Sequence, residues 1–229
     1  MNKTLEYLKN SYNKSYHNPV GEISLAGLRV YVKEPIPEGI DIRSCLSYVF
    51  DNMPRQLYSN VRGIQIGQFP FLRKRQAEAL YKDGIIYLSN DQQSEMDIIS
   101  DVIHEISHAF EEQHSRELYE DKTIENEFLS KRETLYQLLN FHNLVTYPVK
   151  RESFYNLNYD MTFDNYLHQI VGYDKLGTLT VGLFISPYGA TCLREYFANA
   201  FENFFVNDIY LVKKCSPNVY NKLIKFLEM

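Results

Sequence analysis

The chain has 229 residues, which is enough to bury a sizeable core as one domain of ordinary size. Its net charge of −5 argues against a nucleic-acid partner, because a phosphate-binding surface needs a basic excess. No apolar run approaches the roughly 18 residues of a membrane span, and residues 1–19 lack the apolar core and cleavage site of a signal peptide. We therefore expect a protein that stays in the cytoplasm, without nucleic-acid or membrane partners.

Strands are expected in the first half of the chain. Residues 28–34 alternate between apolar and polar side chains and are rich in β-branched residues, and residues 61–67 and 84–89 also have strand character. Asp41 is a capping residue in front of a segment with the apolar spacing of a helix. The segment between the last two strands has helical or loop character.

Helices are expected in the second half. A long one is predicted over residues 91–114, because apolar side chains recur there at spacings of three and four and form one stripe. Further helices are predicted over residues 124–142, 191–208 and 216–228. In residues 147–187 the apolar side chains have no regular spacing, so no element is predicted there. Since strands precede helices without a βαβ alternation, we expect the α+β class.

The long helix carries the pattern H-E-x-x-H at His104, Glu105 and His108. Two histidines four residues apart lie on the same face of a helix, so both imidazoles can reach one metal ion. Glu105 can take a proton from a metal-bound water and later hand it to a leaving amine. The alternative is a solvent-exposed helix with two ordinary histidines, but the apolar flanks of the motif favour a helix that runs through the core.

A zinc hydrolase usually has a third protein ligand, and His114 is the nearest candidate. Its spacing is that of the metzincin pattern H-E-x-x-H-x-x-G-x-x-H, but Glu111 stands where that pattern has the glycine at which the helix ends. On a continuing helix His114 would lie about 15 Å along the axis from His104. We therefore expect His114 to be a surface histidine.

The alternative is a carboxylate from the helix predicted over residues 191–208, which offers Glu195 and Glu202. This helix is heavily apolar and therefore buried, and a buried carboxylate needs a partner. Glu195 lies near the helix start, where the helix dipole also favours a negative charge. A glutamate ligand would complete a His₂Glu site with an open fourth position for water.

Two stretches, DVIHEISHAF and SPYGATCLREYFANAFENFF, together resemble the catalytic domain of anthrax lethal factor and its smaller relatives, among them the secreted Pro-Pro endopeptidases. In that family the pattern Y-G-x-x-x-x-x-E-[FY]-F-A-x-[AS]-F surrounds the ligand. Tyr188, Gly189 and Glu195 occupy its Y, G and E positions here. The resemblance covers the motif helix and roughly residues 186–227.

This resemblance implies Zn²⁺ as the metal ion and a set of roles for residues of this chain. His104, His108 and Glu195 would be the zinc ligands. Glu105 would be the general base, and Tyr188 would donate to the oxyanion of the tetrahedral intermediate. The implied fold is a single zincin-like metallopeptidase domain over residues 1–229.

The sequence departs from the family pattern in two places. Asn199 stands where the relatives have an acid four residues after the ligand, so the surroundings of the ligands are expected to differ. The interval between His108 and Glu195 is also longer than in those relatives. It predicts an insertion around residues 115–185 that shapes or covers the cleft.

The expected function is that of a zinc-dependent endopeptidase, which hydrolyses peptide bonds with metal-activated water. Peptidases of this kind hold an extended peptide against an edge strand, for which residues 84–93 are the candidate. Two alternatives stay open: a non-catalytic zinc-containing binding module, and a zinc amidase that acts on cell-wall peptides. The glutamate at position 105 argues against the first, since a structural zinc site needs no base.

Overall fold

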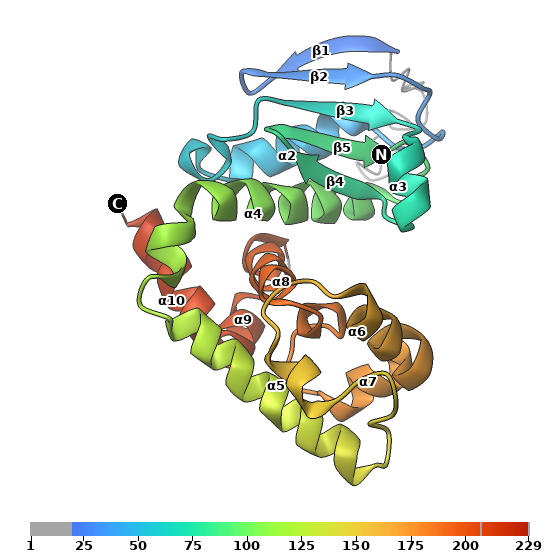
Figure 1. Cartoon of the computed structure of the whole chain (residues 1–229). Coiled ribbons are helices and arrows are strands. Elements are labelled where there is room, and N and C mark those ends of the chain that lie inside the picture. Colours follow the sequence, from blue (N-terminus) through green and yellow to red (C-terminus); the bar gives the residue numbers. More distant parts are fainter. Residues whose placement is uncertain (1–19, 207, 229) are drawn as a thin grey trace, which may run out of the picture. The chain divides into compact units, whose positions relative to one another are not determined.

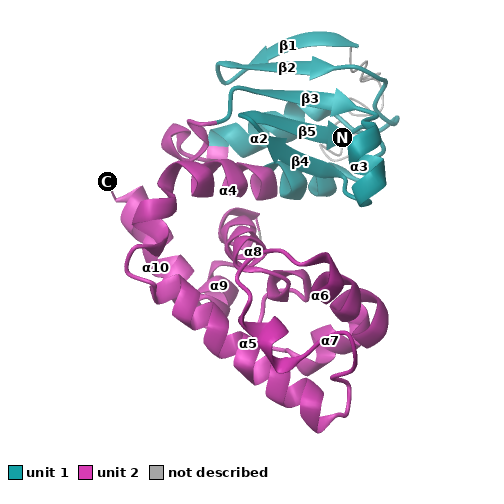
Figure 2. Cartoon of the chain, viewed as in Figure 1, with its two compact units in different colours: residues 1–51, 61–102 teal, residues 52–60, 103–229 magenta. Residues whose placement is uncertain are grey.

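The computed structural model describes residues 20–206 and 208–228, so the prediction about a signal peptide in residues 1–19 lies outside the described residues. Contacts divide the chain into two compact units (Figure 2). We name Met1–Asp51 with Val61–Val102 the sheet unit, and Asn52–Asn60 with Ile103–Met229 the helical unit. A five-stranded mixed sheet followed by a mostly helical remainder confirms the α+β class. The single domain stays a prediction.

The sheet has the strand order β1-β2-β3-β5-β4 (Figure 1). Its strands are β1 Gly21–Leu25, β2 Leu28–Val32, β3 Gly63–Gly67, β4 Ala79–Lys82 and β5 Ile85–Ser89. The hairpins β1–β2 and β4–β5 are antiparallel, whereas β2–β3 and β3–β5 are parallel. The three predicted strands are therefore confirmed as β2, β3 and β5, and the prediction missed β1 and β4.

The prediction that residues 84–93 form an edge strand is wrong. β5 pairs with β3 on one side and with β4 on the other. Asp83 and Gly84 both have positive φ angles, 50° and 80°, and form the tight turn that folds β4 back onto β5. An Asp-Gly pair is typical of such two-residue hairpins, so this signal was present in the sequence. A peptide that extends the sheet would have to pair with β1 or β4.

Among the described residues of the sheet unit, two helices precede α4. In α2, Ile42–Asn52, the apolar residues form one buried face, and the Asp41 carboxylate accepts hydrogen bonds from the backbone N–H groups of Arg43 and Ser44. The short α3, Pro70–Arg75, follows β3 and ends at Gln76, which adopts a left-handed conformation. The helix expected from Asp41 is thus confirmed.

The long helix α4, Glu95–Tyr119, begins in the sheet unit and continues into the helical unit. Its predicted apolar stripe is buried from Ile99 to Phe110. The backbone leaves helical geometry at His114, where φ is −116° and ψ is 22°. The His114 ring is half-buried and lies against Phe110 and Phe226, with ring centroids 4.6 and 4.9 Å away. His114 is therefore a partly exposed residue that packs at a bend, and the expectation of a surface histidine is correct only in part.

The rest of the helical unit consists of helices and helical turns. They are η1 Arg55–Tyr58, α5 Thr123–Phe141, η2 Arg151–Tyr155, α6 Met161–Asn165, η3 Tyr166–Gly172, α7 Tyr173–Leu179, η4 Tyr188–Ala190, α8 Leu193–Val206, α9 Ile209–Cys215 and α10 Pro217–Leu227. The helices predicted over residues 124–142, 191–208 and 216–228 correspond to α5, α8 and α10, which pack against one another. Residues 147–187, whose apolar side chains have no regular spacing, contain the short helical elements η2, α6, η3 and α7. Among the described residues, no helix combines the length and apolar character that crossing a membrane requires.

Candidate metal centre

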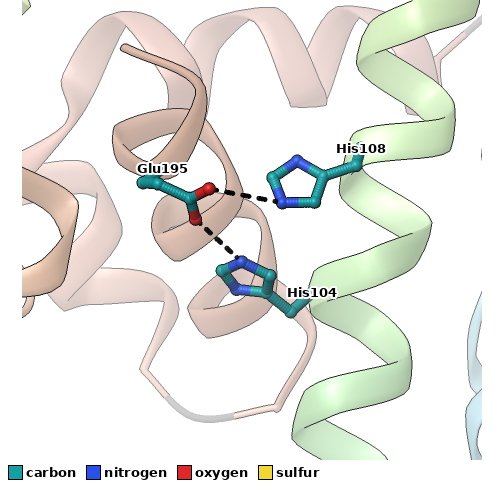
Figure 3. Close-up of side chains that lie close together, drawn as sticks. All are labelled: His104, His108 and Glu195. Atoms are coloured by element: carbon teal, nitrogen blue, oxygen red, sulfur yellow. Dashed lines mark hydrogen bonds and ion pairs between the residues drawn. The ribbon is translucent and has the colours of Figure 1, made fainter. Parts of the chain in front are cut away.

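Three side chains of the helical unit converge from α4 and α8. His104 and His108 lie one turn apart on α4, and their ring planes are nearly perpendicular, with centroids 4.9 Å apart. Glu195 lies in the first turn of α8 and points toward both rings (Figure 3). Its Oε2 is 3.0 Å from Nε2 of His104, and its Oε1 is 3.7 Å from Nε2 of His108. The structure therefore brings these three predicted ligands together.

The geometry of this group is compatible with a metal ion. One ligand atom from each residue lies within 4.8 Å of the others. Ligand atoms at ordinary zinc distances from a tetrahedral ion are about 3.4 Å apart, which falls between the two observed separations. Two imidazole nitrogens and a carboxylate also leave a fourth position for water. His114 does not belong to this group.

Burial and hydrogen bonding set the charges of the three residues. Burial alone would raise the pKa of Glu195, but its hydrogen bond with His104 and the nearby ring of His108 keep that pKa below the usual range. Burial alone would lower the pKa of His104, but hydrogen bonds to Glu195 and Glu202 raise it to about 10. Burial lowers the pKa of His108 to about 3 against the attraction of Glu195. The pairing of Glu195 with His104 therefore favours the charged form of each side chain in the metal-free protein.

A second carboxylate of α8 faces the other side of the His104 ring. Oε2 of Glu202 lies 3.2 Å from Nδ1 of His104. From the sequence Glu202 was an alternative ligand, but in the structure it approaches the nitrogen that points away from Glu195.

The outer nitrogen of His108 has different neighbours. Nε of Arg194 donates a hydrogen bond of 3.0 Å to Nδ1 of His108, and Oε2 of Glu111 lies 4.0 Å from the same nitrogen. Glu111 also accepts a hydrogen bond from the hydroxyl of Tyr119. Burial raises the pKa of Glu111 to about 7 even though that hydrogen bond lowers it. Sequence reasoning missed these neighbours, although the three-residue spacing from His108 to Glu111 is a signal for a shared helix face.

Glu105, the predicted general base, follows His104 directly on α4 and is only 6% exposed. Its negative charge contributes to the raised pKa of His104. It does not belong to the group of converging ligand atoms. Glu105 is thus an ionisable residue next to the candidate ligands and is not itself one of them.

Tyr188, the predicted oxyanion donor, lies in η4, the turn that precedes α8. The residue is 37% exposed. Burial of its phenol and the negative charges of Glu195 and Asp164 hold its pKa well above the ordinary value. The phenol is therefore a protonated hydrogen-bond donor at neutral pH.

Arg132 of α5 holds the backbone between Tyr188 and Glu195. Nη1 donates to the carbonyl oxygens of Ala190 and Thr191 at 2.7 and 3.0 Å, and Nη2 donates to that of Ser153 at 2.7 Å. The side chain is 1% exposed, and the guanidinium lies 4.0 Å from the ring centroid of Phe163. This buried cation fixes the turn that carries Tyr188, and the sequence offered no signal for it.

No protein-family model matches the chain, and no match is found among curated proteins or solved structures. The assignment of a function therefore depends on the motif residues and on the geometry of the site.

Proposed function

We propose that this protein is a zinc-dependent endopeptidase of the lethal-factor-like, zincin kind. The observation that supports the proposal most strongly is the convergence of His104 and His108 with Glu195, which lies 91 residues beyond His104 in the chain. The H-E-x-x-H pattern alone specifies two of these residues. A carboxylate that arrives from a separate helix at both Nε2 atoms is what a His₂Glu site requires.

The residues around this group have the chemistry that peptide hydrolysis needs. A bound zinc ion would polarise the scissile carbonyl group and acidify a water molecule. Glu105 is the proposed general base, which takes a proton from the attacking water and returns it to the leaving amine. Tyr188, kept protonated by its surroundings, is the proposed donor to the oxyanion. A purely structural zinc site would need neither residue.

The proposal is tested by metal analysis and by digestion of a peptide library. We expect about one zinc ion per chain and cleavage of extended peptides by the wild type. Glu105→Gln should retain zinc and lose activity by roughly 10²–10⁴-fold, since it removes only proton transfer.

The other outcomes of this experiment separate the alternatives. Zinc binding without cleavage by the wild type or by Glu105→Gln would favour a non-catalytic binding module. Cleavage of cross-linked cell-wall peptides but not of the library would favour an amidase. Absence of zinc from the wild type would contradict all three functions.

A further inference from the structure

Both ring nitrogens of His104 face carboxylates of the same helix. Nε2 lies 3.0 Å from Oε2 of Glu195, and Nδ1 lies 3.2 Å from Oε2 of Glu202. Glu202 follows Glu195 by seven residues, so their backbone positions lie two turns and about 10.5 Å apart along one face of α8. The imidazole therefore lies between two acids that one rigid element presents.

The chemistry of imidazole indicates what Glu202 can do for His104. A neutral ring carries one proton and can bind a metal ion only through the nitrogen that lacks it. A carboxylate at Nδ1 keeps the proton there and leaves the lone pair of Nε2 free for a metal ion. The side chain of Glu202 is only 19% exposed, so its charge is weakly screened by water.

The neighbouring positions do not provide this acceptor. Asn199, one turn after Glu195, is buried and neutral. On His108 the contact to Nδ1 is a donor, Nε of Arg194, and the nearest carboxylate oxygen of Glu111 is 4.0 Å away. A carboxylate within hydrogen-bond distance of an outer ring nitrogen thus occurs at His104 and not at His108.

We propose that Glu202 is a positioning residue of the metal centre: it fixes the tautomer and the orientation of His104 so that Nε2 is presented beside Glu195. This inference rests on the proposed function, because it assumes that the site takes a zinc ion. It assigns Glu202 a role distinct from that of a ligand.

The experiment measures zinc affinity by competition with a chelator, using the full chain and its Glu202→Ala and Glu202→Gln variants. Loss of such an outer partner typically weakens metal binding by about 10–100-fold, which is the expectation for Glu202→Ala. Glu202→Gln keeps an acceptor oxygen and loses the charge, so its effect should be smaller. Glu120→Gln is the matched control, because it removes the same charge from an exposed side chain of the chain and should bind zinc like the wild type.

A spectroscopic readout separates positioning from general damage to the fold. Substitution with Co²⁺ should give visible absorption bands that shift in Glu202→Ala and not in Glu120→Gln, because the orientation of His104 changes at the metal. Circular dichroism of the metal-free variants checks their folding. If Glu202→Ala does not fold, the zinc affinity and cobalt spectrum of the nearly isosteric Glu202→Gln test the role of Glu202 instead.

The two proposals fail in different ways. A wild type that binds no zinc overturns the proposed function. A wild type that binds zinc, together with folded Glu202 variants whose affinities and cobalt spectra match it, overturns the role of Glu202 alone. An equal loss of affinity in Glu120→Gln would also overturn it, since the effect would then come from net charge.

Discussion

The sheet unit and the helical unit bury different kinds of side chain. Among the buried polar and charged residues that the structure describes, only Gln92 lies in the sheet unit, and the other nine lie in the helical unit. The centre of the sheet is apolar, with Val30, Ile64, Ile86 and Leu88 at most 1% exposed. In the helical unit, by contrast, ionisable groups such as Glu105, His108, Arg132 and Glu195 are at most 9% exposed.

This difference places most of the buried ionisable groups, and with them the candidate metal centre, in the helical unit. A buried charge is costly unless specific partners compensate for its lost hydration. In the helical unit such partners exist: His104 pairs with Glu195, and Arg132 pairs with three carbonyl oxygens. We therefore expect changes of the buried charges in the helical unit to affect metal binding and stability strongly and specifically.

Removal of the proposed carboxylate ligand should have the largest effect. Glu195→Ala deletes a direct partner of both histidines, so its loss of zinc affinity should exceed the roughly 100-fold upper range of outer partners and reach about 1,000-fold. Chelator competition measures it, with Glu120→Gln as the control of equal charge change. Unchanged affinity in Glu195→Ala, with a loss in His114→Ala, would reverse the choice of ligand.

Replacement of the buried Arg132 should have the second largest effect. Arg132→Met leaves three carbonyl oxygens without their donor and should lower the free energy of unfolding by about 3 kcal/mol. Denaturant titration measures it. Arg151→Met is the matched control, since it breaks an ion pair on a side chain that is 55% exposed and should cost much less stability. An equal decrease of the free energy of unfolding in the two variants would show that the buried hydrogen bonds of Arg132 do not stabilise the fold more than an exposed ion pair.

Removal of the phenol hydroxyl should affect catalysis and not metal binding. Tyr188→Phe should lower kcat about 10²-fold and leave zinc affinity unchanged, because the proposed function makes Tyr188 an oxyanion donor and not a ligand. Steady-state kinetics on a library-derived peptide measures this change. A loss confined to KM would instead indicate a role in binding the substrate.

The smallest expected effect is a change of the free energy of unfolding with pH. Burial raises the pKa of Glu111 to about 7, above its ordinary value of 4.5, so the folded protein holds this proton more tightly than the unfolded chain. The stability from this group is fully present below pH 4.5 and is lost as the pH rises through 7. The unfolding free energy of the metal-free wild type minus that of Glu111→Gln should therefore fall between pH 4.5 and 7. A difference that is constant or rises with pH would contradict the assigned pKa.

Local sequence patterns predicted much of the site but little of its surroundings. The spacing of His104 and His108 fixes their shared helix face, and the apolar character of α8 made a buried carboxylate a natural partner for them. The choice between Glu195 and Glu202 depends on how α8 meets α4, which no local pattern encodes. Resemblance to a family favoured Glu195, and only the structure shows Glu202 at the opposite nitrogen of His104.

The errors in the fold have similar causes. β5 was expected at the edge because its hairpin partner β4 was interpreted as part of a helical or loop segment, although Asp83-Gly84 marks the turn. The bend of α4 at His114 occurs without Gly or Pro, at a residue whose ring contacts Phe110 and Phe226. Arg132 was missed because its three acceptors are backbone carbonyls, which any sequence supplies.

The most direct test of the metal centre is anomalous diffraction at the zinc absorption edge from crystals of the zinc-loaded protein. We predict one peak about 2.0–2.2 Å from Nε2 of His104, from Nε2 of His108 and from a carboxylate oxygen of Glu195. A peak that lies elsewhere, or full zinc occupancy with Glu195 turned away from both rings, would contradict the proposed centre.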